Sequence, residues 1–533
     1  YLIAETPTLP AYKKDKKHAT ISYTNPADDS LSFTAADAVM DVQGTSSQYY
    51  YKKNFKIKYD GGFEDSNGNW SKYYKLRGDK SKEEKTFTYK ADVASSEGAN
   101  NVELVRYFED TKNWFSPAEL MPDEDIPGST DSKQRIRVGI DGFPIVMFHN
   151  NGETTSFYGK MNFNNDKGNN RTYGFKDGDE CWELLHNTSD LVLFKTDDLT
   201  NWQDSFESRY PEEVGDDEHA YGTYPEERSK LQEVLSWVVS TRRLDTDSEE
   251  IKQQKLAKFK AEFTNYFDLN SSLFYYLYTE LFLLVDSRAK NAMLTYLKSR
   301  QPGDGGDKWF WFPYDMDTGL GINNEGLLVY DFDKEDTDTQ EGAYIFNGQD
   351  SVFWMNIRDS FSSELKNMYN VLRTSSDGRI AWSFDTIEKY YSDHHAVWSE
   401  SIFNEDAYNK YLEPYVLNQD ATYLGMAQGS KAEQRRWWLA NRFKYIDSKY
   451  RTGEASEKTI MLRAYARSNF EVTPYINCYS TAVFDQATEG LTVTKKAGKG
   501  EVTVLEPPAS WNPANRDSVV ILYSDDILRD IGD

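Results

Sequence analysis

The chain has very little cysteine: Cys181 and Cys478 are the only two in 533 residues. Two thiols form neither a disulfide framework nor a cysteine-based zinc cluster. The sequence therefore predicts a protein of a reducing cytoplasm, or of a particle that is assembled there.

Long apolar runs are also missing. The most apolar segment, Leu273–Val285, is shorter than a membrane span and contains Glu280, so it predicts a buried helix and no membrane span. The first residues, Tyr1–Glu5, show neither a Met nor a signal-peptide pattern. The last ones, Leu528–Asp533, resemble the entry to another unit, so we expect a chain cut from a longer protein.

Cations are scarce relative to acids, with 61 Lys and Arg against 87 Asp and Glu and a net charge of −26. Such a surface repels phosphate backbones, which argues against nucleic acid as a partner. The one dense basic run, residues 13–17, predicts a solvated arm or, alternatively, a docking site.

Aromatic residues are abundant, at 15% of the chain, which indicates packed cores and excludes a disordered chain. Periodicity 2 dominates the first part, helical periodicity the middle and periodicity 2 again the end. We predict an α+β protein with four parts: an N-terminal arm (1–18), a β-rich lobe (19–205), a helical lobe (206–457) and a β appendage (458–533).

Helical spacing of apolar residues marks most of the third part. The predicted helices cover residues 227–241, 248–266, 272–285, 289–297, 360–372, 384–397, 405–412 and 429–452. A tryptophan-rich strand over 309–313 interrupts them.

Lys53 falls in a predicted strand over 49–59, on the same face as Phe55 and Ile57. A lysine that faces the interior needs an acidic partner or a phosphate. The alternative is a lysine whose ammonium reaches solvent at the sheet edge.

Two acidic motifs bring together the side chains best suited to catalysis, and no other part of the sequence offers a comparable set. Asp286 is followed five residues later by Asn291, and Asp315 and Asp317 follow the tryptophan-rich strand. Kinase-type sites use such groups to orient a hydroxyl substrate and to hold Mg²⁺. Asp286 would orient the hydroxyl, and the other three would bind Mg²⁺ through oxygen ligands. A chance Asp-x₄-Asn match, a plain turn or a calcium site are the alternatives.

Four stretches of the chain resemble the CotH kinase-like family, and together they extend over about residues 20–450. They are Gly44–Ser47 with Lys52–Lys58, Asp141–Val146 with Phe157–Asn162, Asp286–Asn291 with Phe312–Asp317, and Gly429–Trp438. Two departures occur: the turn reads Val-Gln-Gly-Thr-Ser-Ser where active relatives often have Arg-Gly-Asn-Ser, and Gly159–Asn164 lacks the acidic residue often found there.

This resemblance implies an atypical protein-kinase-like fold with two lobes. Active members use ATP and Mg²⁺ to phosphorylate protein Ser or Thr. By position, Lys53, Gly44 and Ser46 would bind ATP, Asp286 would be the catalytic carboxylate, and Asp317 would bind the metal.

A narrower resemblance concerns Asp-Gly-Phe-Pro-Ile-Val and Phe-Asn-Asn-Asp-Lys, which are similar to CotH-like proteins of phages of Gram-positive bacteria. It implies a structural protein of the virion, in the tail or baseplate, assembled in the bacterial cytoplasm. Its partners would be other virion proteins or further copies of itself in a symmetric assembly. The alternative is an active protein Ser/Thr kinase of the spore-coat type.

Overall fold

The structure is a computed structural model in which a defined set of residues is described. These are residues 1–44, 47–50, 52–78, 81–93, 97–112, 124–125, 133–134, 137–185, 188–211, 230–300, 302–322, 330–335, 339–340, 343–344, 348, 350–374, 380–396, 431–452, 458–466, 476–484, 492–496 and 502–506.

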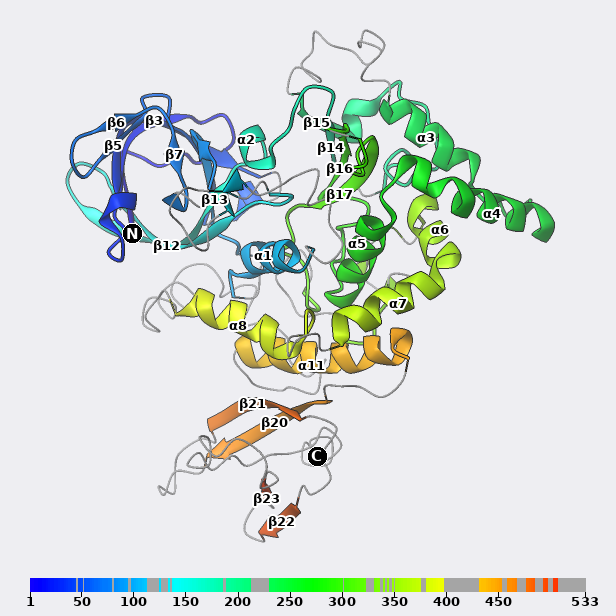
Figure 1. Ribbon diagram of the computed structural model, residues 1–533. Coiled ribbons are helices and arrows are strands. Elements are labelled where there is room, and N and C mark those ends of the chain that lie inside the picture. The colour runs from blue at the N-terminus through cyan, green and yellow to red at the C-terminus, as the bar shows by residue number, and fades with distance from the viewer. Residues whose placement is uncertain are drawn as a thin grey trace.

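Seven strands of the N-terminal part close into a barrel, seen at the left of Figure 1. Around the ring, the order is β2-β1-β12-β13-β9-β4-β3, and β3 pairs back with β2. The strands are β1 (Leu2–Glu5), β2 (Lys17–Tyr23), β3 (Phe33–Gln43), β4 (Asn54–Lys58), β9 (Thr86–Lys90), β12 (Gly142–Asn150) and β13 (Thr155–Asn165). Two short strands, β5 (Phe63–Asp65) and β6 (Trp70–Ser71), extend the sheet from β3.

Large side chains fill the inside of the barrel. Phe55, Tyr89 and Phe163 are all fully buried, and the Tyr89 and Phe163 rings stack with centroids 4.7 Å apart. Because side chains alternate along a strand, the residues between these aromatics point outward. The barrel therefore has an apolar interior and a separate outer face that is free to carry polar groups.

The first 18 residues do not form the arm that we predicted. Leu2 and Ala4 are fully buried, and β1 pairs in parallel with β12 and antiparallel with β2. The short apolar stretch Leu-Ile-Ala gives β1 an inward face. The backbone groups of β2 and β12 that would otherwise be unpaired form hydrogen bonds with β1.

Helices and a four-stranded sheet, ordered β15-β14-β16-β17, make up the middle of the chain. The strands are β14 (Glu180–Leu184), β15 (Phe206–Tyr210), β16 (Ala292–Leu297) and β17 (Lys308–Pro313). The helices of the described residues are α1 (Asn100–Lys112), α2 (Asn170–Tyr173), α3 (Lys230–Ser240), α4 (Glu249–Tyr266), α5 (Leu269–Leu281), α6 (Val352–Ser360), α7 (Ser362–Arg373), α8 (Phe384–His395) and α11 (Lys431–Tyr450).

Two expectations for this region are wrong. Residues 289–297 contain the strand β16, not a helix, and β16 is buried along its whole length. Strand β14 falls within the predicted β-rich lobe 19–205 but pairs with β16. An apolar run that is buried on all sides has no periodicity, so its pattern cannot separate a strand from a helix. The predicted helix over 405–412 lies outside the described residues.

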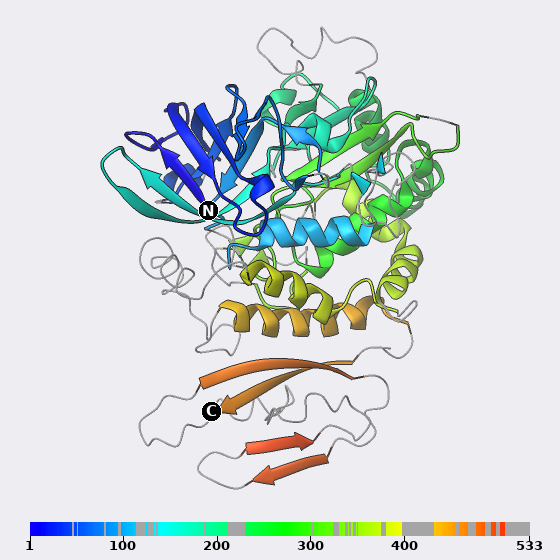
Figure 2. The same ribbon diagram turned by 60° about the vertical axis from the view of Figure 1, so that its left-hand side comes forward.

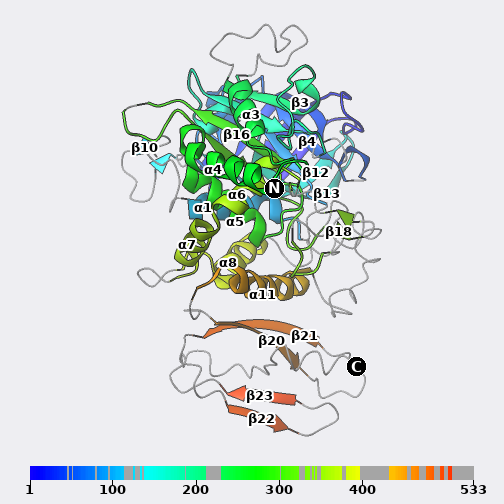
Figure 3. The same ribbon diagram turned by 90° about the vertical axis from the view of Figure 1, so that its right-hand side faces the viewer.

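Two hairpins of two strands each lie beyond α11 in Figures 2 and 3. They are β20 (Lys458–Ala466) with β21 (Ile476–Phe484), and β22 (Thr492–Lys496) with β23 (Val502–Glu506). Both fall in the predicted β appendage. The remaining short strands pair locally: β7 (Tyr74–Lys75) with β8 (Glu83–Glu84), β10 (Glu124–Asp125) with β11 (Lys133–Gln134), and β18 (Thr339–Gln340) with β19 (Ala343–Tyr344).

Among the described residues, no helix has both the length and the apolar character that crossing a bilayer requires.

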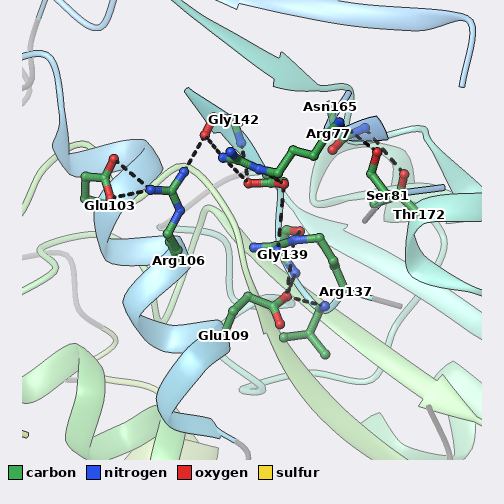
Figure 4. Close-up of polar contacts among 12 residues, drawn as sticks. Arg77, Ser81, Glu103, Arg106, Glu109, Arg137, Gly139, Gly142, Asn165 and Thr172 are labelled. Carbon is green, nitrogen blue, oxygen red and sulfur yellow. Dashed lines mark hydrogen bonds and ion pairs between the residues drawn. The ribbon is translucent and has the colours of Figure 1, made fainter. Parts of the chain in front are cut away.

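A network of buried acids and partly exposed arginines attaches α1 to the barrel (Figure 4). Arg77 binds Asp141 through two hydrogen bonds, of 2.6 and 3.0 Å, and Arg77 and Arg106 both donate to the Gly142 carbonyl. Arg137 lies 3.9 Å from the same aspartate. Burial alone would raise the pKa of Asp141, but Arg77 and Arg137 hold it well below its usual range.

We expect Arg77→Ala to lower the free energy of unfolding by about 2–3 kcal/mol. This is less than the ~3–5 kcal/mol of a fully buried pair because Arg77 is partly exposed. The matched control is Lys85→Ala, which removes the exposed ion pair between Lys85 and Asp60 and should cost under ~1 kcal/mol. Urea titration measures the free energy of unfolding of both variants. Equal losses in the two variants would contradict a stabilising role of the network.

Candidate functional site

The loop that follows α5 and precedes β16 holds the first acidic motif. Asp286 is 1% exposed, and its Oδ2 atom accepts a hydrogen bond of 3.1 Å from the Asn291 amide. The Asn291 backbone has a φ of 53°, a left-handed conformation that asparagine tolerates better than most residues. The Asp-x₄-Asn spacing thus closes a loop in which the two side chains meet.

The second motif is the turn that follows β17. Asp315 also has a left-handed backbone, with a φ of 51°, so the chain turns directly after the strand. Thr318 donates from its hydroxyl to Asp286 Oδ1 over 3.1 Å, and the Val285 backbone N–H donates to the Thr318 carbonyl. The two acidic motifs, which the sequence separates by the tryptophan-rich strand, are therefore joined in space.

A lysine from the barrel meets this turn. Lys90, the last residue of β9, places its Nζ 2.6 Å from Asp315 Oδ1, and the Asn101 amide donates to the same oxygen over 2.9 Å. Burial alone would lower the pKa of Lys90, but Asp315 raises it well above its ordinary value. Lys90 is thus a charged ammonium, only 6% exposed, at the acidic turn.

The Asp317 carboxylate is in the opposite situation. Among the described residues, none donates a hydrogen bond to this carboxylate, and Asn100 bonds only to the Asp317 backbone carbonyl. Burial, and after it the negative charge of Asp315, raises the pKa of Asp317 well above its ordinary value. The charge of Lys90 opposes that rise only in part, and Asp317 forms no ion pair among the described residues.

The ionised form of Asp286 is also disfavoured. Burial raises its pKa, the charge of Lys290 opposes that rise, and the charge of Asp315 adds to it. Two carboxyl groups with raised pKa values therefore lie beside an ion-paired third one. Groups with perturbed pKa values gather at functional sites more often than elsewhere.

Further lysines line the barrel side. Lys160 of β13 is 3% exposed, and Lys167 lies with its Nζ 2.8 Å from Glu183 Oε1 and 4.9 Å from the centre of the Tyr314 ring. Lys90 and Lys160 both point outward from the filled barrel, toward the acidic turn and the helices. Positive charge from the barrel thus faces negative charge from the loops.

Lys53 does not join this site. It lies just before β4, and its ammonium donates to the backbone carbonyls of Gln48 and Tyr50 over 2.5 and 2.6 Å. The tight turn at residues 47–49 brings those carbonyls within reach. The structure therefore does not place Lys53 opposite the acidic motifs, and the lysine found there is Lys90.

Gly44 has a structural reason for being glycine. Its φ is 98°, and a Cβ atom there would lie 1.9 Å from Ser47 Oγ. Ser46 lies outside the described residues. An ATP-binding role for these two residues remains a prediction.

The sequence-based prediction of the site does not include Lys90, although the strand pattern around it contains a signal. In Thr86–Lys90, Phe87 and Tyr89 alternate with polar residues, so Lys90 must share the outward face with Thr88. Asp92 follows on the same segment. Which loop meets that outward face depends on the tertiary fold, and the strand pattern does not contain that information.

The residues present fit a Mg²⁺ ion with phosphate groups. In the described part of the chain, Asp317 forms no ion pair, and the Oδ1 atoms of Asn101 and Asn162 are buried without a hydrogen bond. Mg²⁺ prefers such oxygens, usually with one or two carboxylates, several waters and substrate phosphates. No group of three His, Cys, Asp or Glu side chains suited to a metal occurs among the described residues, so protein carboxylates alone would not complete the coordination.

A hollow of about 380 Å³ elsewhere on the barrel is lined by residues of β1, β2 and their neighbours, including His18 and Asp37. It contains none of the predicted site residues. Its His18–Asp37 pair is largely exposed, unlike the buried groups around Asp286.

We expect Asp317→Asn to stabilise the protein at neutral pH, because the amide removes a charge that burial and Asp315 both disfavour. Lys90→Met should destabilise it, because Asp315 then loses its ion-pair partner. Thermal unfolding of both variants beside the wild type at pH 7 tests this. A lower melting temperature for Asp317→Asn would contradict the proposed electrostatic balance.

Comparison with known proteins supports a kinase-like assignment for the middle of the chain. No curated protein matches the sequence. Residues 186–413 match the family model described as CotH kinase protein. This range contains Asp286, Asn291, Asp315 and Asp317, whereas the barrel with Lys90 precedes it. Over these residues the chain is therefore similar to the CotH kinase family.

Proposed function

We propose that the protein is an ATP- and Mg²⁺-dependent phosphotransferase of the CotH type, acting on a hydroxyl group of a protein. The barrel and the helical part would be the two lobes of an atypical kinase-like fold. The observation that carries the proposal is the meeting of Lys90 with Asp315 beside the joined Asp286 and Asn291. A fold alone does not specify activity, but these groups match the needs of phosphoryl transfer.

Each residue has a task in this proposal. Phosphoryl transfer depends mainly on positioning and on charge neutralisation. Asp286 would accept a hydrogen bond from the attacking hydroxyl and orient it. Asp317, Asp315 and Asn291 would hold Mg²⁺, which would neutralise phosphate charge when bound.

Lys90 would contact the phosphates of ATP. For that contact, its ammonium must exchange part of its interaction with Asp315 for a phosphate oxygen, and the carboxylate thereby becomes available to the metal. The outward lysines Lys160 and Lys167 add positive potential on the same side. This arrangement favours a polyanionic ligand between the barrel and the acidic turn.

The test is transfer of labelled phosphate from Mg²⁺-ATP to the protein itself and to a Ser/Thr-containing protein mixture. Asp286→Asn should lower the rate by roughly 10²–10⁴-fold, the usual contribution of a positioned acid or base. Lys90→Met should also lower it strongly. Lys58→Met, an exposed lysine on β4, is the matched control and should match the wild type.

Lys53→Met distinguishes the two candidate lysines. A loss of activity confined to Lys53→Met would favour the assignment by resemblance over Lys90. Equal phosphate transfer by the wild type and Asp286→Asn would reject the phosphotransferase.

A structural role in a phage virion is a second candidate, supported by the sequence resemblance and by the C-terminal hairpins. In the described part of the chain, β20 pairs only with β21, and β22 only with β23. The β20–β21 hairpin contacts α11, whereas an isolated two-stranded hairpin is marginally stable in water, so it is β22–β23 that suits a surface completed by other virion proteins or further copies.

The virion role predicts that purified particles contain the protein at a fixed copy number per particle. Quantitative mass spectrometry of particles, before and after a high-salt wash, measures this. A protein that is absent from particles, or that the wash removes, would exclude the structural role. The phosphotransferase test is independent of this outcome.

A further inference from the structure

Three buried side chains from three separate elements meet between the barrel and the helices. Lys160 belongs to β13, Glu103 to α1 and His394 to the last turn of α8, and they are 3%, 1% and 2% exposed. His394 Nδ1 lies 2.8 Å from Glu103 Oε1, and His394 Nε2 lies 3.0 Å from Lys160 Nζ. We refer to Lys160, His394 and Glu103 as the buried triad.

The chemistry of the partners determines which ring nitrogen carries the proton. An ammonium can only donate, so His394 Nε2 accepts from Lys160, and Nδ1–H donates to the Glu103 carboxylate. Burial, and after it the charge of Lys160, holds the pKa of His394 well below its ordinary value. A neutral imidazole is the one protonation state that satisfies both neighbours.

The triad also fixes the segment that leads into α1. Lys160 Nζ donates to the Gly98 carbonyl, and the Asn162 amide donates to the same oxygen over 2.8 Å. Gly98 has a φ of 66°, and a Cβ atom there would lie 2.5 Å from Lys160 Nζ. The barrel lysine is thus packed directly against the backbone before the helix.

Helix α8 makes further contacts with the same end of α1. The Tyr391 hydroxyl donates to Asn100 Oδ1 over 2.6 Å, and His395 Nε2 lies 2.8 Å from Glu97 Oε1. Tyr391, His394 and His395 of α8 therefore hold the first turn of α1 and the residues before it.

That first turn of α1 in turn holds the acidic turn. Asn100 donates to the Asp317 carbonyl over 3.1 Å, and Asn101 donates to Asp315 Oδ1 over 2.9 Å. A continuous series of contacts thus runs from α8 through α1 to the two aspartates.

We propose that His394 is a positioning residue: by bridging Lys160 of the barrel and Glu103 of α1, it fixes the end of α1 that places Asp315 and Asp317. The catalytic consequence rests on the proposed phosphotransferase, whereas the structural consequence does not. His394 itself touches neither the acidic turn nor Asp286 through any contact described here. It acts through Asn100 and Asn101.

The experiment compares His394→Ala, which removes both hydrogen bonds, with His394→Asn, which keeps a donor near the position of Nδ1. His149→Ala is the matched control, because His149 bonds to the Thr6 carbonyl over 2.8 Å on another part of the barrel. Two quantities are measured in the full chain: hydrogen–deuterium exchange of residues 97–105, and kcat and KM for ATP in phosphate transfer. Thermal unfolding checks that each variant is folded.

We expect exchange in residues 97–105 to become roughly tenfold faster in His394→Ala, as the loss of a buried hydrogen bond implies. His394→Asn should restore part of the protection, and His149→Ala should leave it unchanged. In phosphate transfer, His394→Ala should lower kcat by roughly 10- to 100-fold, the usual effect of a small misplacement, with little change in KM for ATP.

Unchanged exchange in a folded His394→Ala variant would overturn the proposal. If His394→Ala does not fold, His394→Asn decides in the same way, by whether residues 97–105 exchange faster than in the wild type. A wild-type protein that transfers no phosphate would reject the phosphotransferase, and the exchange measurement would still decide whether His394 positions α1. A fall in kcat without faster exchange would also contradict a positioning role.

Discussion

The ion pair between Lys90 and Asp315 is the interaction on which the candidate site depends. It joins the outer face of the barrel to the turn after β17, two parts of the chain that are 225 residues apart in sequence. The Lys90 ammonium is buried and the Asp315 carboxylate is partly buried, so each charge is unfavourable without the other. The pair therefore requires the barrel, α1 and the acidic turn to keep one arrangement, and Asn101 adds a hydrogen bond to the same carboxylate.

The carboxylates beside this ion pair, those of Asp317 and Asp286, are not neutralised to the same extent as Asp315. Asp315 forms an ion pair with Lys90, whereas Asp317 forms none among the described residues, and Asp286 has two hydrogen bonds and Lys290 at 3.8 Å. A protein selected only for stability would not keep an uncompensated carboxylate in this position. Since function can require such a group, the charge imbalance supports the proposed phosphotransferase site.

The sequence predicts the amphipathic helices well, because α4 and α7 each bury one side only and so keep a helical period. It also assigns Asp286 and Asn291 to one candidate site, and the structure brings their side chains within hydrogen-bond distance. It fails for Lys53 and for β16, for two different reasons. Lys53 lies one residue before β4, so strand alternation does not apply to it, and β16 is buried on both faces and has no period. Lys90 lies within a strand whose alternation places it on the outer face, but its partner Asp315 is determined by the tertiary structure.

Because the interior of the barrel is filled, alternate residues of each strand have different roles: one set packs in the core and the other lies on the outer face. In β9, Phe87 and Tyr89 contribute to the core, whereas Thr88 and Lys90 lie on the outer face, where Lys90 meets the acidic turn. Substitutions at inward positions are therefore limited by packing inside the barrel, and those at outward positions by the contacts with the neighbouring helices and the acidic turn. Changes at the outward positions of β9 and β13 therefore alter how the barrel contacts α1, α8 and the acidic turn, while the packing inside the barrel stays the same.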